Sequence, residues 1–267
     1  MTVPIALTVA GSDSGGGAGI QADLKTFEAL GVYGASVLTA VAAQNTLAVS
    51  SIHEVPSVMV RDQLRAVLSD LPPAAVKVGM LGSVPLIRLV AQELRKHGAP
   101  VVLDPVMVGK SGARLLRPAA LHALVRLLLP GATVITPSIP EAEILIGAPI
   151  QSEADAKAAA RRIQELGPRA VLLKGGYRQG DRVMDGFLDG RTWHRFEGPR
   201  LQTTSTHGSG CTLASAIAAY LARGETLPDA VEKAIRFVRL AIEHAPGLGA
   251  GRGPLGHRAA GFLLRDR

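Results

Sequence analysis

The segment from Thr206 to Thr212, THGSGCT, places glycine, hydroxyl and thiol groups directly before a run of small residues, LASAIAAYLA. Such a run predicts a helix, and glycines before a helix leave backbone N–H groups open at the positive end of its dipole. This arrangement favours a bound phosphate. We therefore predict that Gly208, Ser209 and Gly210 form an anion hole for a phosphoryl group.

Cys211, the only cysteine of the chain, falls in the first turn of that predicted helix. A helix N-terminus lowers the pKa of a thiol, which would make Cys211 a base or a nucleophile. The alternative is a small side chain buried in a tightly packed helix, and the flanking glycines favour the chemical role. His207 either orders the loop or transfers protons.

A second glycine-rich segment, Gly11–Gly19 (GSDSGGGAG), follows the first apolar run of the chain. Its five glycines allow backbone N–H groups to approach a ligand closely. The segment matches neither the G-x-x-x-x-G-K-[ST] phosphate loop nor the Rossmann G-x-G-x-x-G pattern. A tight turn would need only one or two glycines, so we predict a binding loop.

Charged residues stand where three later apolar runs end. Asp104 follows VVL, and Glu141 follows ITPSIP. Two such carboxylates would hold Mg²⁺ largely through water, although turn formation and helix capping are their alternative roles. Lys174 ends the run AVLLK, where it would meet phosphate charge or remain a solvated lysine.

Gln44, Met80 and Met107 offer one amide and two flexible apolar side chains. Together they would line an apolar pocket in which the amide reads a heterocycle. Core packing is the alternative for the methionines, because they commonly fill core gaps.

The elements that must position these residues alternate along the chain. Apolar runs typical of buried parallel strands cover 5–10, 36–42, 76–78, 101–103, 133–136 and 170–174. Helical patterns lie near 19–30, 57–70, 83–97, 118–129, 153–166, 210–223 and 227–244. This order predicts the α/β class, with three α/β/α layers around a mostly parallel sheet whose ligands bind beyond the carboxyl ends of the strands.

Three segments depart from the alternation. Residues 181–196 turn at Asp189-Gly190, which predicts an antiparallel hairpin late in the chain. Residues 33–54 are expected to add a small strand flap, and the basic residues 245–267 to run loosely over the surface. No linker or repeat divides the sequence, so we expect a single domain over 1–267.

The composition narrows the class of protein. The formal net charge of +7 would suit a nucleic-acid binder, but the chain has only nine aromatic residues and no basic stretch interleaved with them. A single cysteine excludes an internal disulfide, and no run reaches the ~18 apolar residues of a membrane span. We expect a cytoplasmic protein with neither nucleic acid nor membrane as partner.

Six motifs together, AGSDSGGGAGIQADLKT, VKVGML, VLDPVMV, TPSIPEAE, LLKGG and THGSGCT, resemble the hydroxymethylpyrimidine/phosphomethylpyrimidine kinases of thiamine biosynthesis, in the ribokinase-like superfamily. The resemblance covers almost the whole chain in order. It implies phosphorylation of 4-amino-5-hydroxymethyl-2-methylpyrimidine, and then of its monophosphate to the diphosphate, with ATP and Mg²⁺. It also implies a homodimer and leaves a monovalent cation open as a further cofactor.

The same resemblance implies a role for each motif residue. The pyrimidine contacts would be Gly11, Ala18, Asp23, Gln44, Met80 and Met107. The residues for Mg²⁺ and ATP would be Asp104, Glu141, Lys174 and Thr206. The anion hole would be Gly208, Ser209 and Gly210, Cys211 the base, and residues 109–112 (GKSG) a cover over the phosphates. The chain has Ser138 and Ser205 where the family commonly has Asn.

Two alternative functions remain open from the sequence. A pyridoxal or pyridoxine kinase shares this scaffold and also phosphorylates a hydroxymethyl group on an aromatic heterocycle. A non-catalytic nucleotide or nucleic-acid binding protein would fit the positive charge but has no need of the glycine–cysteine loop.

Overall fold

The computed structural model describes residues 3–107, 116–175 and 180–265, so the predicted cover at 109–112 lies outside the described residues. Within these ranges a single sheet runs through the molecule, in the strand order β3-β2-β1-β4-β5-β6-β7-β8-β9. Its parallel strands are β1 (Ile5–Asp13), β2 (Tyr33–Gln44), β4 (Ala75–Val78), β5 (Val101–Leu103), β6 (Val134–Ile135) and β7 (Ala170–Leu173). The direction of strand progression reverses between β1 and β4, and open α/β sheets bind ligands at such a point.

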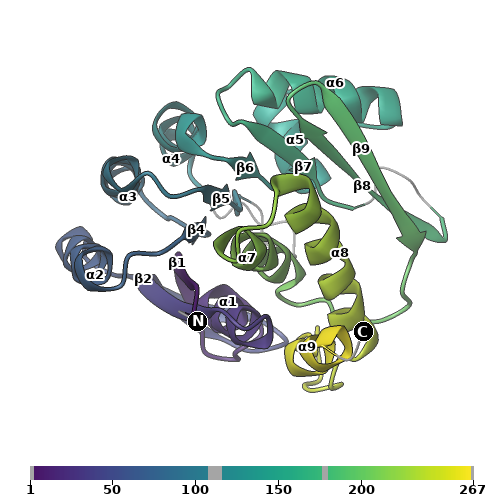
Figure 1. Cartoon of the computed structure of the whole chain (residues 1–267), viewed down its shortest axis with the longest axis horizontal. Helices are drawn as coiled ribbons and strands as arrows, with labels where there is room; N and C mark the ends of the chain where they lie inside the picture. Colours follow the sequence, from purple (N-terminus) through teal and green to yellow (C-terminus); the bar gives the residue numbers. More distant parts are fainter. Residues whose placement is uncertain (1–2, 108–115, 176–179, 266–267) are drawn as a thin grey trace.

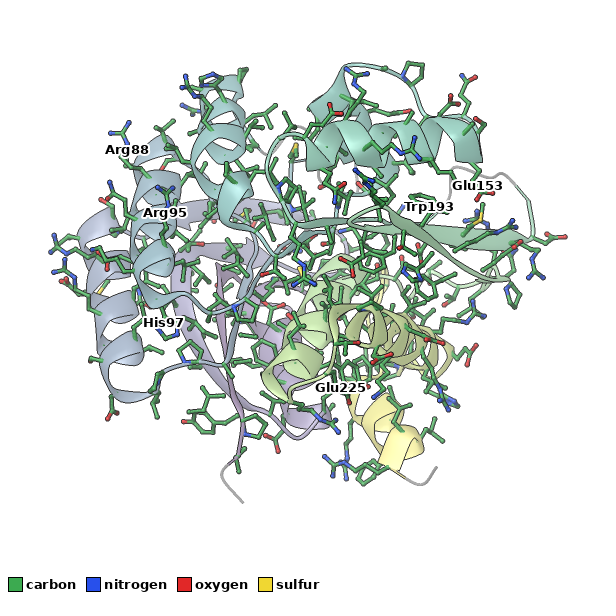
Figure 2. All side chains as sticks on the ribbon, turned by 45° about the horizontal axis from the view of Figure 1, so that its top comes forward. Arg88, Arg95, His97, Glu153, Trp193 and Glu225 are labelled. Carbon is green, nitrogen blue, oxygen red and sulfur yellow. The ribbon has the colours of Figure 1, made fainter. Side chains whose placement is uncertain are left out.

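Antiparallel strands extend the sheet at both edges. The strand β3 (Val49–Glu54) pairs with the end of β2 and forms the predicted flap. At the other edge lie β8 (Arg182–Asp189) and β9 (Thr192–Pro199), with Asp189 opposite Thr192 across the turn. The predicted late hairpin is therefore confirmed. Trp193 Nε1 donates to Glu153 Oε1 at 3.2 Å and ties the hairpin to the neighbouring helix (Figure 2).

Helices cover both faces of the sheet, which confirms the predicted three layers (Figure 1). One face carries α2 (Ser57–Asp70), α3 (Val84–His97), α4 (Pro118–Ala123), α5 (Ile139–Ile146) and α6 (Glu153–Gln164). The other carries α1 (Gly19–Ala29), α7 (Ser209–Ala222), α8 (Leu227–Glu243) and α9 (His257–Arg265). None of the helices in the described chain has the length and apolar character needed to cross a membrane.

Burial on both faces explains the nearly continuous apolar strands. Every residue of β4 and of β7 is buried. The small side chains of α7, including Ala216, Ala218 and Ala219 at 0% exposure, let that helix pack against β1, β4 and β5. The N-terminus of α7 thereby comes to the carboxyl edge of the central strands.

Three predictions about the elements need correction. The tail does not run loosely throughout, because α9 packs on α1 and α8 with Leu255 and Ala260 buried. The helix expected near 118–129 ends as α4 and continues through a π-helical turn (η1, Leu124–Leu128) and a 3-10 turn (η2, Leu129–Gly131). The sequence pattern does not predict the short helix α5, because its apolar residues are not confined to one face of the helix.

Candidate active site

The residues predicted to form an anion hole, Gly208, Ser209 and Gly210, lie at the start of α7 (Ser209–Ala222). Gly208 is the N-cap with φ +79°, and a Cβ there would overlap the carbonyl group of Gly17, so both the turn and the close approach require glycine. Ser209 N–H donates to the carbonyl oxygen of Thr206 at 3.3 Å. The N–H groups of Gly210 and Cys211 are in the first turn, where a helix supplies no internal acceptors. They are therefore suited to an anionic ligand.

Lys174 and Asp104 meet beside this helix start. Lys174 Nζ lies 2.6 Å from Asp104 Oδ1, and a methyl group at Gly210 would lie 3.1 Å from the same Nζ. Burial lowers the pKa of Lys174, but the carboxylates of Asp104 and Glu141 outweigh burial and raise it, so the side chain stays cationic. The structure thus brings a cation, a carboxylate and the predicted anion hole into contact.

Glu141 serves as the N3 residue of a capping box at the start of α5. Its Oε2 accepts hydrogen bonds from Ser138 N (2.8 Å) and Ser138 Oγ (2.7 Å), and its Oε1 accepts one from Met107 N (3.1 Å). The capping role considered from the sequence is therefore confirmed. Each carboxylate oxygen has two lone pairs, so these contacts leave capacity for another ligand.

The thiol of Cys211 lies between two glycine loops, where the N–H of Gly19 donates to it. The prediction that its pKa falls is wrong for this structure. Burial raises the pKa of the thiol, while the Lys77 ammonium and the Gly19 N–H act in the opposite direction. The helix start alone does not overcome the removal of the thiolate from water.

The N-terminal glycine loop closes around the carboxylate of Asp13. Its oxygens accept hydrogen bonds from Gly15 N (2.8 Å), Gly17 N (3.0 Å) and Ala18 N (2.8 Å). Ala18 is the last residue of this loop and the N-cap of α1. Some of the loop amides that the sequence assigned to a ligand are occupied by an internal carboxylate.

Two predicted substrate contacts, Gly11 and Met80, lie together next to this loop. A methyl group at Gly11 would be 3.0 Å from Met80 Cε, and one at Gly19, whose φ is +55°, would overlap the carbonyl group of Gly11. Because Gly19 also donates to Cys211, these residues share one corner of the sheet edge with the thiol.

Gln44 lies at the end of β2, on the other side of the glycine loop. Ser14 Oγ donates to the Gln44 carbonyl oxygen at 2.6 Å and accepts from the Gln44 N–H at 2.8 Å. The Gln44 side chain approaches His207, with 3.1 Å between the two Nε2 atoms. The amide is thus near both glycine loops.

Two predicted substrate contacts are placed differently. The Asp23 side chain is fully buried and accepts from Lys77 Nζ, Thr8 Oγ1 and Ser215 Oγ at 2.6 to 2.7 Å, so a direct pyrimidine contact does not fit the structure. Met107 is 3% exposed and packs in the core, which is the alternative considered for it.

Thr206 and Ser205 stand at the entry to the anion-hole loop. The Thr206 N–H donates to the carbonyl oxygen of Thr204 at 2.9 Å, and the Ser205 N–H donates to Thr203 Oγ1 at 3.1 Å. Two surface hollows of the described chain lie away from this loop, one near Arg191 and the other around Tyr220, at the opposite end of α7 from Gly208.

The sequence profile of the phosphomethylpyrimidine kinase family matches residues 13–256. The chain belongs to the phosphomethylpyrimidine kinase family. It is 50% identical over 256 residues to a hydroxymethylpyrimidine/phosphomethylpyrimidine kinase of Rhizobium meliloti, covering 95% of this chain and 96% of that protein. It is also 53% identical over 262 residues to the thiamine biosynthesis bifunctional protein ThiED of Geobacter sulfurreducens, covering 98% of this chain but only 54% of the length of that relative.

Solved structures include close neighbours of this phosphomethylpyrimidine kinase family member. The pyridoxal kinase of Staphylococcus aureus in complex with ADP superposes with a TM-score of 0.90 at 38% identity, covering 97% of this chain and 95% of that one. The ribokinase-like fold predicted from the motifs is therefore confirmed.

Sequence reasoning missed Asp13 and Lys77 as organisers of the candidate site in this phosphomethylpyrimidine kinase family member. Asp13 is 3% exposed and Lys77 is fully buried. A signal was available for Lys77, since a charged residue inside the buried run AVKV requires a buried partner. The role of Asp13 had no comparable signal, because an Asp in a glycine-rich loop is ordinary turn chemistry.

Proposed function

We propose that this chain is an ATP-dependent hydroxymethylpyrimidine/phosphomethylpyrimidine kinase. It would phosphorylate the hydroxymethyl oxygen of 4-amino-5-hydroxymethyl-2-methylpyrimidine, and then the phosphate oxygen of the monophosphate, to give the diphosphate. The observation that carries the proposal is the packing of Gly210 against the Lys174–Asp104 pair at the start of α7. Family membership and the names of the relatives support the choice of substrate.

Phosphoryl transfer depends mainly on positioning and on neutralising charge. The Lys174 ammonium and the N–H groups of Gly210 and Cys211 would offset the negative charge on the transferred group. They come from the end of β7 and from α7, so little reorganisation is needed when that charge develops.

Mg²⁺ fits the carboxylates of Asp104 and Glu141. Both are oxygen donors with remaining lone pairs, and both influence Lys174 electrostatically. Mg²⁺ commonly keeps several waters and is held by one or two carboxylates plus substrate phosphates, so two carboxylates are enough for the proposed site. When bound, Mg²⁺ would supply positive charge to the phosphate oxygens of ATP. A monovalent cation stays a prediction.

Cys211 is the proposed base of the first transfer. The hydroxymethyl oxygen forms a bond to the γ-phosphorus of ATP while the bond between that phosphorus and the leaving ADP oxygen breaks. The hydroxyl proton passes to Sγ of a Cys211 thiolate. Burial raises the pKa of this thiol, while the Lys77 charge and the Gly19 N–H act in the opposite direction, so Cys211 accepts the proton only from its minor thiolate form. The second acceptor is an already ionised phosphate oxygen, which needs no base.

A pyridoxal kinase is the second candidate, favoured by the Staphylococcus aureus structure. Mass spectrometry of a time course with Mg-ATP separates the two. Monophosphate followed by diphosphate from hydroxymethylpyrimidine is the expected result. Phosphorylation of pyridoxal alone would favour the second candidate, and no product from either would contradict both.

A homodimer is the proposed assembly. Exposed apolar side chains lie along the flap, with Val41 47%, Val49 48% and Ile52 49% exposed on β2 and β3. An unpaired edge strand with apolar side chains favours association. Sedimentation equilibrium should give twice the chain mass, and Ile52→Lys should shift it towards the single-chain mass.

A further inference from the structure

The imidazole of His207 joins three segments of the site. Its Nε2 lies 2.9 Å from Asp13 Oδ2 in the N-terminal glycine loop and 3.1 Å from Gln44 Nε2 at the end of β2. His207 also directly precedes Gly208, the N-cap of α7. No step of the proposed reaction uses this residue.

The ring has a fixed position. The backbone N–H of His207 donates to the carbonyl oxygen of Gly253 at 3.0 Å. A methyl group at Gly17 would lie 2.6 Å from His207 Cδ2, so the ring edge packs directly on that glycine. The His207 side chain is 16% exposed. A ring held in this way can determine the orientation of a neighbouring side chain.

The contact with Asp13 defines the hydrogen-bonding role of Nε2. Asp13 Oδ2 also accepts hydrogen bonds from Gly17 N and Ala18 N, so it acts as an acceptor. His207 Nε2 must then carry a proton and donate it to Asp13. This holds for the neutral ring with its proton on Nε2 and for the protonated ring alike.

A donor at Nε2 determines how the Gln44 amide is turned. If the Gln44 NH₂ faced His207, two donors would oppose each other at 3.1 Å. Rotating the amide by about 180° places its oxygen, an acceptor, against His207, because the amide oxygen and nitrogen have nearly the same shape. The single Nε2–H of His207 is then shared, in a three-centre hydrogen bond, between Asp13 Oδ2 and the Gln44 oxygen. The NH₂ group is then the end of the amide left for a ligand. The Gln44 backbone is held in place by Ser14.

We propose that His207 is a positioning residue for substrate recognition: it holds the oxygen of the Gln44 amide, so that the NH₂ donates to a ring nitrogen of the heterocyclic substrate. This rests on the proposed function, in which Gln44 contacts the pyrimidine. The loop that supplies the anion hole would then also orient the group that reads the ring. A substrate lacking an acceptor at that place would leave the NH₂ unpaired and bind more weakly.

The test compares His207→Phe, which keeps a ring without a donor, with His207→Gln, which restores an N–H donor. For His207→Phe the KM for hydroxymethylpyrimidine should rise about tenfold, which is the loss of affinity expected for one hydrogen bond. The kcat and the KM for ATP should stay within about threefold of the wild-type values. His207→Gln should recover most of that loss. In a Gln44→Ala background, His207→Phe should raise the KM for hydroxymethylpyrimidine by less than a further factor of about two if the two residues act as a unit.

An unchanged KM for the pyrimidine, or a fall in kcat with a higher KM for ATP, would overturn the positioning role. The positioning role would also be overturned if the increases in KM of Gln44→Ala and His207→Phe multiply in the double variant. Wild-type protein that turns over no hydroxymethylpyrimidine would overturn the proposed function and this inference together, whereas normal wild-type turnover with an unaffected His207→Phe overturns the inference alone.

A measurement on wild-type protein guards against variants that fail to fold. Two substrate analogues, each with one ring nitrogen replaced by C–H, are titrated calorimetrically. One of them should bind about tenfold more weakly than the parent pyrimidine. Equal binding of the parent and both analogues would overturn the proposal.

Discussion

Lys77 and Asp23 form an ion pair whose side chains are both at 0% exposure, with 2.7 Å between Nζ and Oδ2. Asp23 Oδ1 also accepts from Ser215, one helical turn after Cys211 on α7. Burial lowers the pKa of Lys77, but the Asp23 carboxylate and the other nearby acidic groups outweigh burial and raise it. The pair thus joins β4, α1 and α7 beneath the candidate site.

Lys77→Met should lower the free energy of unfolding by about 3–5 kcal/mol, because it leaves the Asp23 carboxylate buried without its countercharge. Urea unfolding measures this change. Lys96→Met is the matched control, since Lys96 pairs with Glu93 at the surface with a 68% exposed side chain. The double variant Lys77→Met/Asp23→Asn should recover some of the loss. Equal stabilities of the Lys77 and Lys96 variants would contradict this account.

Cys211→Ala should slow the first phosphorylation by about 100-fold, a typical contribution of a general base. The second phosphorylation should change by only a few fold, because its acceptor oxygen is already ionised. Separate rates starting from the alcohol and from the monophosphate measure the difference, and the second step serves as the internal control. Equal losses in both steps would remove Cys211 from the role of base.

Asp104→Asn should reduce turnover and raise the Mg²⁺ concentration needed for half-maximal rate, since a carboxylate donor is lost near Lys174. Binding of the pyrimidine, measured by calorimetry, should stay near the wild-type value. Asp155→Asn, a helix-capping change on α6, is the control. A large loss of pyrimidine affinity in Asp104→Asn would contradict the assignment to the metal and nucleotide.

His257 should make stability depend on pH. It is 4% exposed, its Nε2 lies 2.9 Å from Thr212 Oγ1, and burial lowers its pKa to about 4. The unfolded chain takes up this proton near pH 6.5, before the folded protein does. The stabilisation is therefore complete above about pH 6.5 and is lost as the pH falls towards 4, by up to about 3 kcal/mol.

Urea unfolding from about pH 7.5 to about pH 4.5, a range that spans most of this transition, compares wild type with His257→Gln, which should show a flatter profile. His53→Gln on the exposed strand β3 should keep the wild-type slope. If His257→Gln follows the wild-type profile, another group causes the dependence.

Much of the fold could be predicted from local patterns. The apolar run at Ala170–Leu173 and the Asp189-Gly190 turn defined β7 and the hairpin, because burial on both faces and turn geometry act over a few residues. The helix α9 could not be predicted this way, because it has only nine residues and its buried residues, such as Ala260, are covered by packing on α1 and α8. Its stability is a tertiary property.

The sequence by itself determined the residue types of the candidate site: glycines before α7, a lysine and an acid at strand ends, and a cysteine in the first helical turn. Only the tertiary structure decided their contacts. It brought Lys174 to Asp104 across 70 positions and His207 to Asp13 across 194, and it enclosed Asp23 away from the sheet edge. The physical reason is that hydrogen bonding, burial and the resulting pKa of Cys211 depend on distance in space, which sequence spacing does not encode.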